Sequence, residues 1–309
     1  MATSKNAEKF YKLEGEELTF FQNQTNIEDE DELRAHIVDV QRKAFEVFGY
    51  NCIRRFAFLK LKIPHLPGYK EAFKLLRSQN DPIILDIGCC FGNDTRKAVL
   101  DGWPIDRVIA SDLRQEFWDY GHELFKSTPE TFPAKFIAGD IFNPSMLAPR
   151  GPFIDDGEIS NALSSPTPTL SGLTSLTPLQ GKLSAIHASA FFHLFTEDEQ
   201  RALARLLSSL LRPEKGSVIF GQHGAKPQKG FRKHVRGPST EANQMFCHSP
   251  ESWKEMWLKD VYGGEDGKGD ERIKIGADLV QVVRKDLLDG SESAEDAKFY
   301  VLNWCIMRL

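Results

Sequence analysis

Three acidic residues in the first half of the chain each belong to a short apolar run. Carboxylates at this spacing could bind a nucleoside. Asp86 lies within the run I-I-L-D-I-G, Asp112 ends R-V-I-A-S-D, and Asp140 ends A-K-F-I-A-G-D. In a parallel sheet with helical crossovers, the carboxyl ends of the strands meet at one edge. We therefore expect the three carboxylates to line one crevice, although acids at strand ends are also common turn formers.

The loop that follows the first run has the pattern D-x-G-x-x-x-G over residues 86–92. Gly88 and Gly92 allow backbone angles and a close ligand approach that a side chain would block. Taken alone the pattern is weak, and a plain strand-to-helix turn is the alternative. Cys89 and its neighbours replace the G-x-G-x-x-G that seats a dinucleotide pyrophosphate. The loop thus favours a cofactor without phosphate, such as S-adenosylmethionine, over a nicotinamide dinucleotide.

The two later acids could recognise the adenosine part of such a cofactor. Asp112 follows the loop by roughly 20 residues or more, the distance at which an acid on the second strand binds two ribose hydroxyls. Asp140 could accept a hydrogen bond from the adenine amino group. Leu113 and Ile141 offer apolar faces for the ring.

Four segments carry a resemblance to a known family: A-F-E-V-F-G-Y-N-C-I at 44–53, L-D-I-G-C-C-F-G at 85–92, A-S-D-L-R at 110–114 and I-H-A-S-A-F-F-H-L-F at 186–195. They resemble class I S-adenosylmethionine-dependent methyltransferases and, more narrowly, those of fungal meroterpenoid pathways such as austinol biosynthesis. The similarity covers most of residues 44–257. It implies a Rossmann-like α/β fold with seven strands, mostly parallel and closed by a C-terminal antiparallel hairpin. It also implies that Ala188 and Ser189 face the methionine end of the cofactor.

The elements that must position these residues can be placed along the chain. We expect an N-terminal helical cap or lid over residues 1–80 and a cofactor-binding core over 81–309, with a flexible insertion at 143–181 that is rich in Pro, Ser and Thr. Thr25 to Glu28 matches a capping box before a helix, and Thr196 with Glu199 matches another. Strands are expected at 183–187 and 216–221, and a hairpin at 272–283 and 298–309.

Methyl transfer needs alignment and water exclusion more than it needs a catalytic side chain, because the sulfonium is already a good leaving group. A carboxylate acceptor is ionised and needs no base, whereas a phenol would gain from a histidine base. We rank His193 first and His248 second, ahead of His187 and His223. Packing or hydrogen bonding is the alternative for each histidine.

The cap offers residues that could contact a substrate. Arg54 and Arg55 could pair with an acidic substrate or with the cofactor's carboxylate, because a guanidinium binds a carboxylate at two points. Surface exposure is the alternative for both. Tyr50 belongs to a group of cap aromatics that suits an apolar substrate and equally suits a core.

The composition is that of an ordinary soluble enzyme. The 309 residues are 41% hydrophobic and carry a formal net charge of -5, so no global basic field favours nucleic acid. The basic run 226–236 is interpreted as a solvated loop. Five cysteines without zinc-like pairing indicate a reducing compartment, and we predict no metal. The absence of a signal core or an apolar span predicts a cytoplasmic location.

The function expected from the sequence is methylation in specialised metabolism. Oxygen, in a carboxylate or a phenolic hydroxyl, is the expected target, on an apolar acceptor of terpenoid, meroterpenoid or polyketide type; the family resemblance, and no single residue, favours oxygen. Nitrogen or carbon methylation on the same scaffold stays open, as does a methyltransferase-like regulatory protein without turnover. A homodimer is also left open.

Overall fold

A seven-stranded sheet forms the centre of the protein. The computed structural model describes residues 8–233, 244–283 and 298–309. The strands of the sheet are β1 (Ile84–Ile87), β2 (Val108–Asp112), β3 (Lys135–Ala138), β4 (Ala185–His187), β5 (Val218–Ala225), β8 (Ile273–Val283) and β9 (Lys298–Arg308). Their order is β3-β2-β1-β4-β5-β9-β8. The first five are parallel, and β9 runs antiparallel to both of its neighbours. The predicted class I sheet and its closing hairpin are confirmed.

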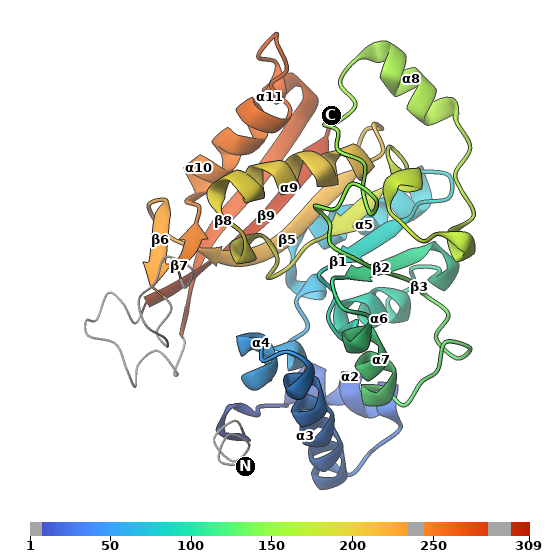
Figure 1. The fold of residues 1–309 in the computed structure, drawn as a ribbon, viewed down its shortest axis with the longest axis vertical. Coiled ribbons are helices and arrows are strands. Elements are labelled where there is room, and N and C mark those ends of the chain that lie inside the picture. The colour runs from blue at the N-terminus through green and yellow to red at the C-terminus, as the bar shows by residue number, and fades with distance from the viewer. Residues whose placement is uncertain (1–7, 234–243, 284–297) are drawn as a thin grey trace.

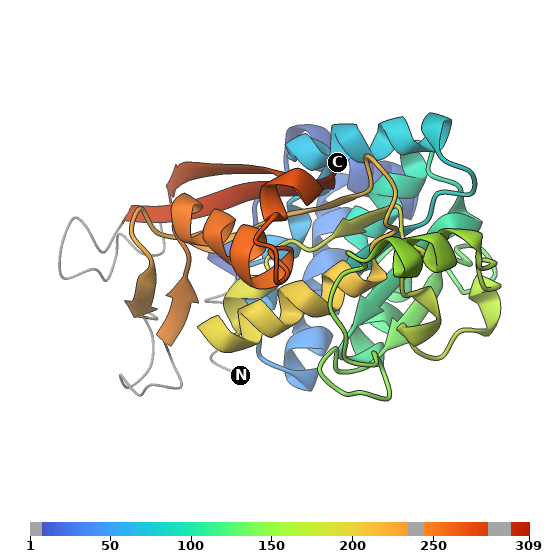
Figure 2. The same cartoon turned by 90° about the horizontal axis from the view of Figure 1, so that it is seen from above.

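Helices cover both faces of this sheet (Figure 1). The α-helices are α2 (Gly15–Thr25), α3 (Glu30–Val47), α4 (Asn51–Arg54), α5 (Pro67–Ser78), α6 (Asn93–Leu100), α7 (Gln115–Leu124), α8 (Asp156–Ser164), α9 (Glu197–Leu210), α10 (Pro250–Glu255) and α11 (Gly269–Arg272). Short 3-10 turns are η1 (Glu8–Phe10), η2 (Ala57–Leu59), η3 (Ile63–His65), η4 (Ile105–Arg107), η5 (Leu170–Gly172), η6 (Thr177–Leu179) and η7 (Phe192–Leu194), and η9 (Met256–Val261) is a π-helical turn. Figure 2 shows α5 on one side of the sheet and α9 on the other.

The parallel strands are buried on both faces, which explains their continuous apolar runs. All four residues of β1 are buried. Side chains alternate between the two faces, so that Ile84 joins the core beneath α5 and Leu85 joins the core beneath α9. Because β1 to β5 are parallel, their carboxyl ends form one edge, as expected from the sequence.

The N-terminal helices α2, α3 and α4 pack together against α7 (Figure 1). Phe21 stacks on Phe125 at the end of α7, with ring centroids 5.3 Å apart. Helix α5 lies elsewhere, because Tyr69 packs on Phe220 of β5 in the core of the sheet. The group of helices that packs apart from the sheet, α2 to α4, therefore ends before α5. Residues 67–78 form part of the layer that covers the sheet.

One predicted helix start is wrong and another is confirmed. Thr25 is the last residue of α2; its hydroxyl donates to the carbonyl of Phe21 and accepts from the N–H of Ile27, which lies before α3, so it does not cap that helix. Asp29 caps α3 instead, accepting from the N–H of Glu32 at 2.8 Å. At α9, Thr196 forms the predicted capping box with Glu199.

The segment 143–181 is more structured than its composition predicts. It contains α8, whose N-cap Asp155 accepts hydrogen bonds from two backbone N–H groups. Four leucines after this helix are buried in the main core, at Leu170, Leu173, Leu176 and Leu179. These leucines bury apolar surface that holds the segment on the sheet layer, and the predicted flexibility of the insertion stays a prediction.

A second, two-stranded sheet also corrects a prediction. β6 (Gly230–Lys233), which lies inside the basic run interpreted as a solvated loop, pairs antiparallel with β7 (Gln244–Cys247). Phe231 and Phe246 face each other across the pair, with ring centroids 5.5 Å apart. Residues 234–236 of that run lie outside the described residues. Within the described parts of the chain, none of the helices is both long and apolar enough to span a membrane.

Candidate active site

The loop between β1 and α6 is built around two glycines in the left-handed backbone region. Gly88 has a φ of +70° and Gly92 a φ of +74°. A Cβ atom at Gly88 would lie 2.7 Å from the ring of Phe191, and one at Gly92 would lie 2.6 Å from Trp118. The N–H groups of Gly88 and Cys89 both donate to one carbonyl at the end of β2. Both predicted glycine positions therefore exclude a side chain.

The acid at the end of β2 is tied to this loop. Asp112 accepts a hydrogen bond from the N–H of Cys90 at 2.8 Å and one from the N–H of Arg114 at 3.3 Å. Burial raises the pKa of Asp112 despite these donors. The carboxylate is half-buried. Each of its oxygens can accept a further hydrogen bond, because an ionised carboxylate has about four lone-pair sites.

The residues predicted to contact adenine differ in exposure. Asp140 is exposed, and one of its oxygens accepts from the N–H of Phe142 at 3.0 Å. Leu113 is 53% exposed, whereas Ile141 is buried in the main core. Leu113 and Asp140 are therefore the accessible members of this group.

Asp86 is a buried residue whose carboxylate is held by two other side chains. It is buried, its Oδ2 accepts from Thr95 Oγ1 at 2.6 Å, and its Oδ1 lies 2.9 Å from His187 Nδ1. His187 in turn lies 2.7 Å from Ser189 Oγ through its Nε2. Asp86 thus joins β1 to β4, and Ser189 ends a chain of buried polar groups. Ala188 is also buried, and its N–H donates to the carbonyl of Phe220 on β5.

The cap reaches the acid at the end of β2. Tyr50 is hydrogen-bonded to Arg114, two residues after Asp112, and burial raises the pKa of Tyr50. Its ring packs on Phe117 of α7, with centroids 5.7 Å apart. The predicted substrate residue Tyr50 therefore lies close to the predicted ribose acid.

The two cap arginines contact other parts of the cap. Arg54 donates to Asn51 Oδ1 at 2.6 Å, and its guanidinium lies over the ring of Phe10. Arg55 also lies over Phe10. These contacts hold both side chains within the cap, and their predicted role toward a carboxylate stays a prediction.

The ranked histidines lie beyond β4 and β5, on the face of the sheet that α9 covers. His193 is half-buried, and its Nδ1 accepts from the N–H of Gly224 at 3.3 Å. His248 is 2% exposed, lies 2.9 Å from Ser252 Oγ, and has its pKa lowered to about 4 by burial. His223 is also buried, which lowers its pKa well below the usual range. Because a base must reach its substrate, the geometry favours His193 over His248.

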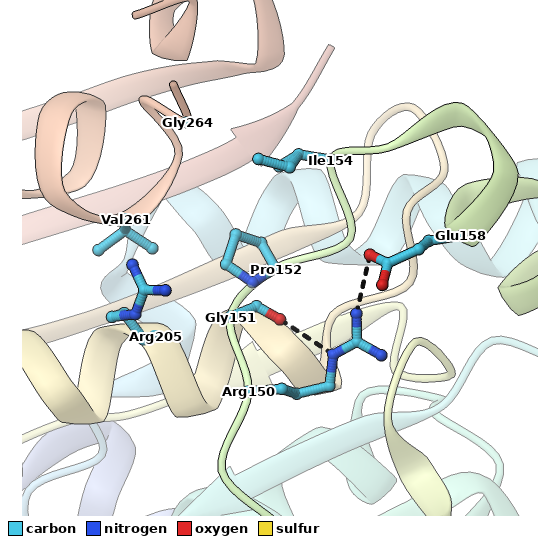
Figure 3. Close-up of a pocket in the computed structure, with 8 residues that line it drawn as sticks. All are labelled: Arg150, Gly151, Pro152, Ile154, Glu158, Arg205, Val261 and Gly264. Atoms are coloured by element: carbon cyan, nitrogen blue, oxygen red, sulfur yellow. Dashed lines mark hydrogen bonds and ion pairs between the residues drawn. The ribbon is translucent and has the colours of Figure 1, made fainter. Parts of the chain in front are cut away.

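A cavity of 370 Å³ lies at the opposite edge of the sheet. Its lining comes from the segment before α8, from α8 and α9, from the end of η9 and from the loop after it: Arg150, Gly151, Pro152, Ile154, Glu158, Arg205, Val261 and Gly264 (Figure 3). Arg150 pairs there with Glu158 at 3.0 Å, and Arg205 donates to the carbonyl of Asp260. This cavity is remote from the glycine loop and plays no part in the site described above. Among the described residues, no cluster of His, Cys, Asp or Glu is arranged to hold a metal ion.

Sequence reasoning missed two features of the loop's surroundings. Thr95 bonds to Asp86, and Gly121 of α7 lies so close that a Cβ there would be 2.3 Å from the carbonyl oxygen of Phe91. A threonine in the first turn of the helix after the loop is a signal for the first contact. The second depends on how α7 packs and has no local signal.

Comparison with known proteins identifies the family. The profile of the meroterpenoid methyltransferase N-terminal domain matches residues 7–59, which hold α2 to α4. The Asnovolin E/Chermesin D methyltransferase nvfJ of Aspergillus novofumigatus is 31% identical over 73% of this chain and 69% of its own length. The methyltransferase ausD of Aspergillus calidoustus is 30% identical over 74% of this chain and 70% of its own. The chain belongs to the meroterpenoid methyltransferases.

Family membership makes the chain a methyltransferase of the kind that fungi use in secondary metabolism, and the cofactor of this class is S-adenosylmethionine. A third relative, the O-methyltransferase phiE of a fungal species, is 31% identical over 72% of this chain. This chain spans 63% of the length of phiE.

Proposed function

We propose that this methyltransferase transfers the methyl group of S-adenosylmethionine to an oxygen atom of an apolar small molecule, in a carboxylate or a phenolic hydroxyl. The observation that carries the cofactor assignment is the bond between Asp112 and the N–H of Cys90, which brings the acid of β2 to the glycine loop after β1. The name of phiE, an O-methyltransferase, supports oxygen as the target. A cytoplasmic location and a homodimer remain predictions.

The residues present fit this cofactor. At Gly88 and Gly92 a Cβ atom would collide with neighbouring rings, so the loop has only backbone atoms at these two positions. Asp112 is half-buried, and its oxygens have lone pairs that the two backbone N–H groups do not use. Binding two ribose hydroxyls requires such free acceptor sites. The exposed Leu113 follows it directly and offers an apolar face to adenine.

Bound S-adenosylmethionine would supply a methyl group activated by its sulfonium; the C–S bond would break as the acceptor oxygen takes the methyl group, and S-adenosylhomocysteine would leave. The chain's own residues would do the rest: Asp112 orients the ribose, and the cap around Tyr50 limits the access of water. For a carboxylate acceptor, no proton has to be removed at neutral pH. For a hydroxyl acceptor, His193 is the histidine that we propose as base.

Calorimetric titration of the purified protein with S-adenosylmethionine and S-adenosylhomocysteine tests the cofactor, with NAD as the control. Micromolar binding of a sulfur ligand and none of NAD is the expected result. If the folded protein binds no sulfur ligand, alone or together with candidate acceptors, the proposal fails.

The acceptor atom is tested by incubating the protein with S-adenosylmethionine and matched terpenoid acids, phenols and amines, followed by mass spectrometry. A gain of one methyl group on an acid that alkaline hydrolysis reverses identifies a methyl ester, whereas a methyl ether resists the same treatment. Methylation of amines or carbon alone would replace oxygen as the target. Tight S-adenosylhomocysteine binding without any product would favour a regulatory protein.

A further inference from the structure

The 370 Å³ cavity shown in Figure 3 brings two arginines to one backbone position. Arg150 Nε donates to the carbonyl of Gly151 at 3.2 Å, and Arg205 Nη2 lies 3.0 Å from the place where a Cβ atom on Gly151 would be. Two guanidinium groups, one from the segment before α8 and one from α9, therefore lie against the same glycine. Because like charges repel, an anion beside them would stabilise this arrangement.

The carboxylates around the cavity do not neutralise both arginines. Glu158 pairs with Arg150 at 3.0 Å, and the side chain of Glu158 is 51% exposed. Arg205 donates to the backbone carbonyl of Asp260, whose carboxylate pairs with Arg201 at 2.9 Å. A guanidinium has five N–H donors, and among the described residues this one bond of Arg205 is found. Its other donors can therefore bind a ligand.

A third guanidinium lies behind the wall of the cavity. Arg308 is 7% exposed, and its Nη2 donates at 3.1 Å to the carbonyl of Phe153, a residue that stands between two lining residues. Its guanidinium also lies over the ring of Tyr262, the neighbour of another lining residue. Within the described parts of the chain, Arg308 Nη1 has no hydrogen-bond partner. A buried charge is costly unless an opposite charge compensates it, so an anion in the cavity would also stabilise Arg308.

The rest of the lining favours an organic anion. Pro152, Ile154 and Val261 give the cavity apolar walls, which a bare inorganic ion could not use. The volume lies within the range of small-molecule sites, which begins at about 300 Å³. At about 30 Å³ for each water molecule, the space corresponds to about a dozen non-hydrogen atoms. A carboxylate suits the charged end, because a guanidinium binds it at two points.

We propose that this cavity binds a small organic acid, with its carboxylate between Arg150 and Arg205 and its body against the three apolar walls. The carboxylate takes the place of Glu158 on Arg150, because the exposed side chain of Glu158 can turn into the solvent. A bound acid thereby joins the segment before α8 to α9 and to the end of η9. The cavity is separate from the glycine loop, so the inference does not depend on the proposed function.

The test follows one methyl group of the cavity by NMR, in protein labelled at its isoleucine methyl groups. Ile154 lines the cavity, and its signal is identified by its loss in Ile154→Val. The probe is phenylbutyrate, a carboxylate of about a dozen non-hydrogen atoms, and its amide and inorganic phosphate are the controls. We expect phenylbutyrate to shift this signal with a millimolar or lower Kd, with and without S-adenosylhomocysteine. The amide and phosphate should bind about tenfold more weakly or worse.

Two substitutions at the cavity should change the affinity in opposite directions. Arg205→Gln removes one guanidinium and should weaken phenylbutyrate binding about ten- to hundredfold, as for a charge-assisted hydrogen bond. Glu158→Gln removes the carboxylate that competes for Arg150 and should strengthen binding several-fold. Arg77→Gln, the control, removes the same charge from an exposed position of α5 on the other side of the sheet and should change nothing. Thermal unfolding shows whether each variant is folded.

The methyl signal distinguishes this cavity from any other place where an apolar acid binds. If phenylbutyrate leaves the Ile154 signal in place, or if the amide shifts it equally, the inference is overturned. Phosphate binding as tight as that of phenylbutyrate would overturn the organic ligand. Unchanged affinity in folded Arg205→Gln would contradict the role of its guanidinium. Should Arg205→Gln fail to fold, Glu158→Gln at its exposed position decides, because unchanged or weaker binding there overturns the inference.

Discussion

The carboxylate of Asp112 accepts a hydrogen bond from the backbone N–H of Cys90 at 2.8 Å. An acid on one strand thereby fixes the loop that follows the neighbouring strand. Cys90 has a φ of +52°, a left-handed conformation that a residue other than glycine seldom adopts. The bond to Asp112 helps to hold that conformation, so the residue proposed to bind ribose also shapes the loop that would hold the rest of the cofactor.

Replacing Asp112 should affect the free energy of unfolding and the affinity for the cofactor in different ways. Burial raises the pKa of Asp112, so the folded state disfavours the ionised carboxylate, and its cost is fully present above the folded pKa. Asp112→Asn removes that charge and still offers an oxygen to Cys90. We expect an unchanged or higher free energy of unfolding at pH 7, with S-adenosylhomocysteine affinity about ten- to hundredfold lower. Denaturant unfolding and calorimetry measure the two effects.

Asp119→Asn, at an exposed position of α7, is the matched control and should alter neither quantity. Unchanged cofactor affinity in folded Asp112→Asn would remove the ribose role from this residue.

The contact between α7 and the loop makes a second prediction. A Cβ on Gly121 would lie 2.3 Å from the carbonyl oxygen of Phe91, and backbone cannot move aside as a flexible side chain can. Gly121→Ala should therefore displace α7, reduce the free energy of unfolding by about 1–3 kcal/mol and weaken S-adenosylhomocysteine binding. Gly276→Ala adds the same methyl group on β8, where no atom lies within 4 Å, and should change neither. A Gly121→Ala protein as stable as the wild type would contradict this packing.

The local sequence was sufficient to predict the strands of the central sheet. It was not sufficient to predict the contacts that join those strands to each other and to the helices. The strands that contain Asp86 and Asp112 were predictable because a strand buried on both faces must be continuously apolar. The bond between Asp86 and His187 joins residues 101 positions apart, and no local pattern encodes it. The same holds for Gly121, whose neighbour is set by the packing of a whole helix.

The helix and the buried leucines of the segment 143–181 were not predicted for another reason. Its Pro, Ser and Thr content indicated a loop. The regular spacing of its four buried leucines, which recur at every third position from 170 to 179, indicated burial and was given less weight. β6 was missed because its residues, G-F-R-K, hold one apolar side chain, and pairing with β7 gives the strand its place. Composition describes the average of a segment, whereas burial depends on a few positions within it.

Two buried histidines predict how stability depends on pH. Burial lowers the pKa of His248 to about 4 and that of His223 well below its usual range. Since both pKa values are depressed in the folded state, the unfolded chain binds more protons below pH 6.5, so stability is lost as the pH falls from about 6.5 toward 4. For His248 alone the loss is about 3 kcal/mol.

Urea unfolding between pH 7.5 and 4.5 measures this slope. His248→Gln should flatten it, although the variant loses the ring packing on Trp253 and should be less stable at neutral pH. His65→Gln, at an exposed position, should leave the slope as in the wild type. An unchanged slope in folded His248→Gln would show that this histidine does not titrate with unfolding.

The last prediction concerns the histidine proposed as base. His193 accepts the N–H of Gly224 at its Nδ1, so the neutral ring carries its proton on Nε2, and the two nitrogens must exchange roles before Nε2 can take a proton. His193→Ala should bind S-adenosylhomocysteine as the wild type does. With a phenolic acceptor its turnover should fall about a hundredfold or more, the usual contribution of a general base. With a carboxylate acceptor, which is already ionised, the loss should be small. Steady-state kinetics on both acceptors distinguishes the cases, and full activity of His193→Ala on a phenol would eliminate it as the base.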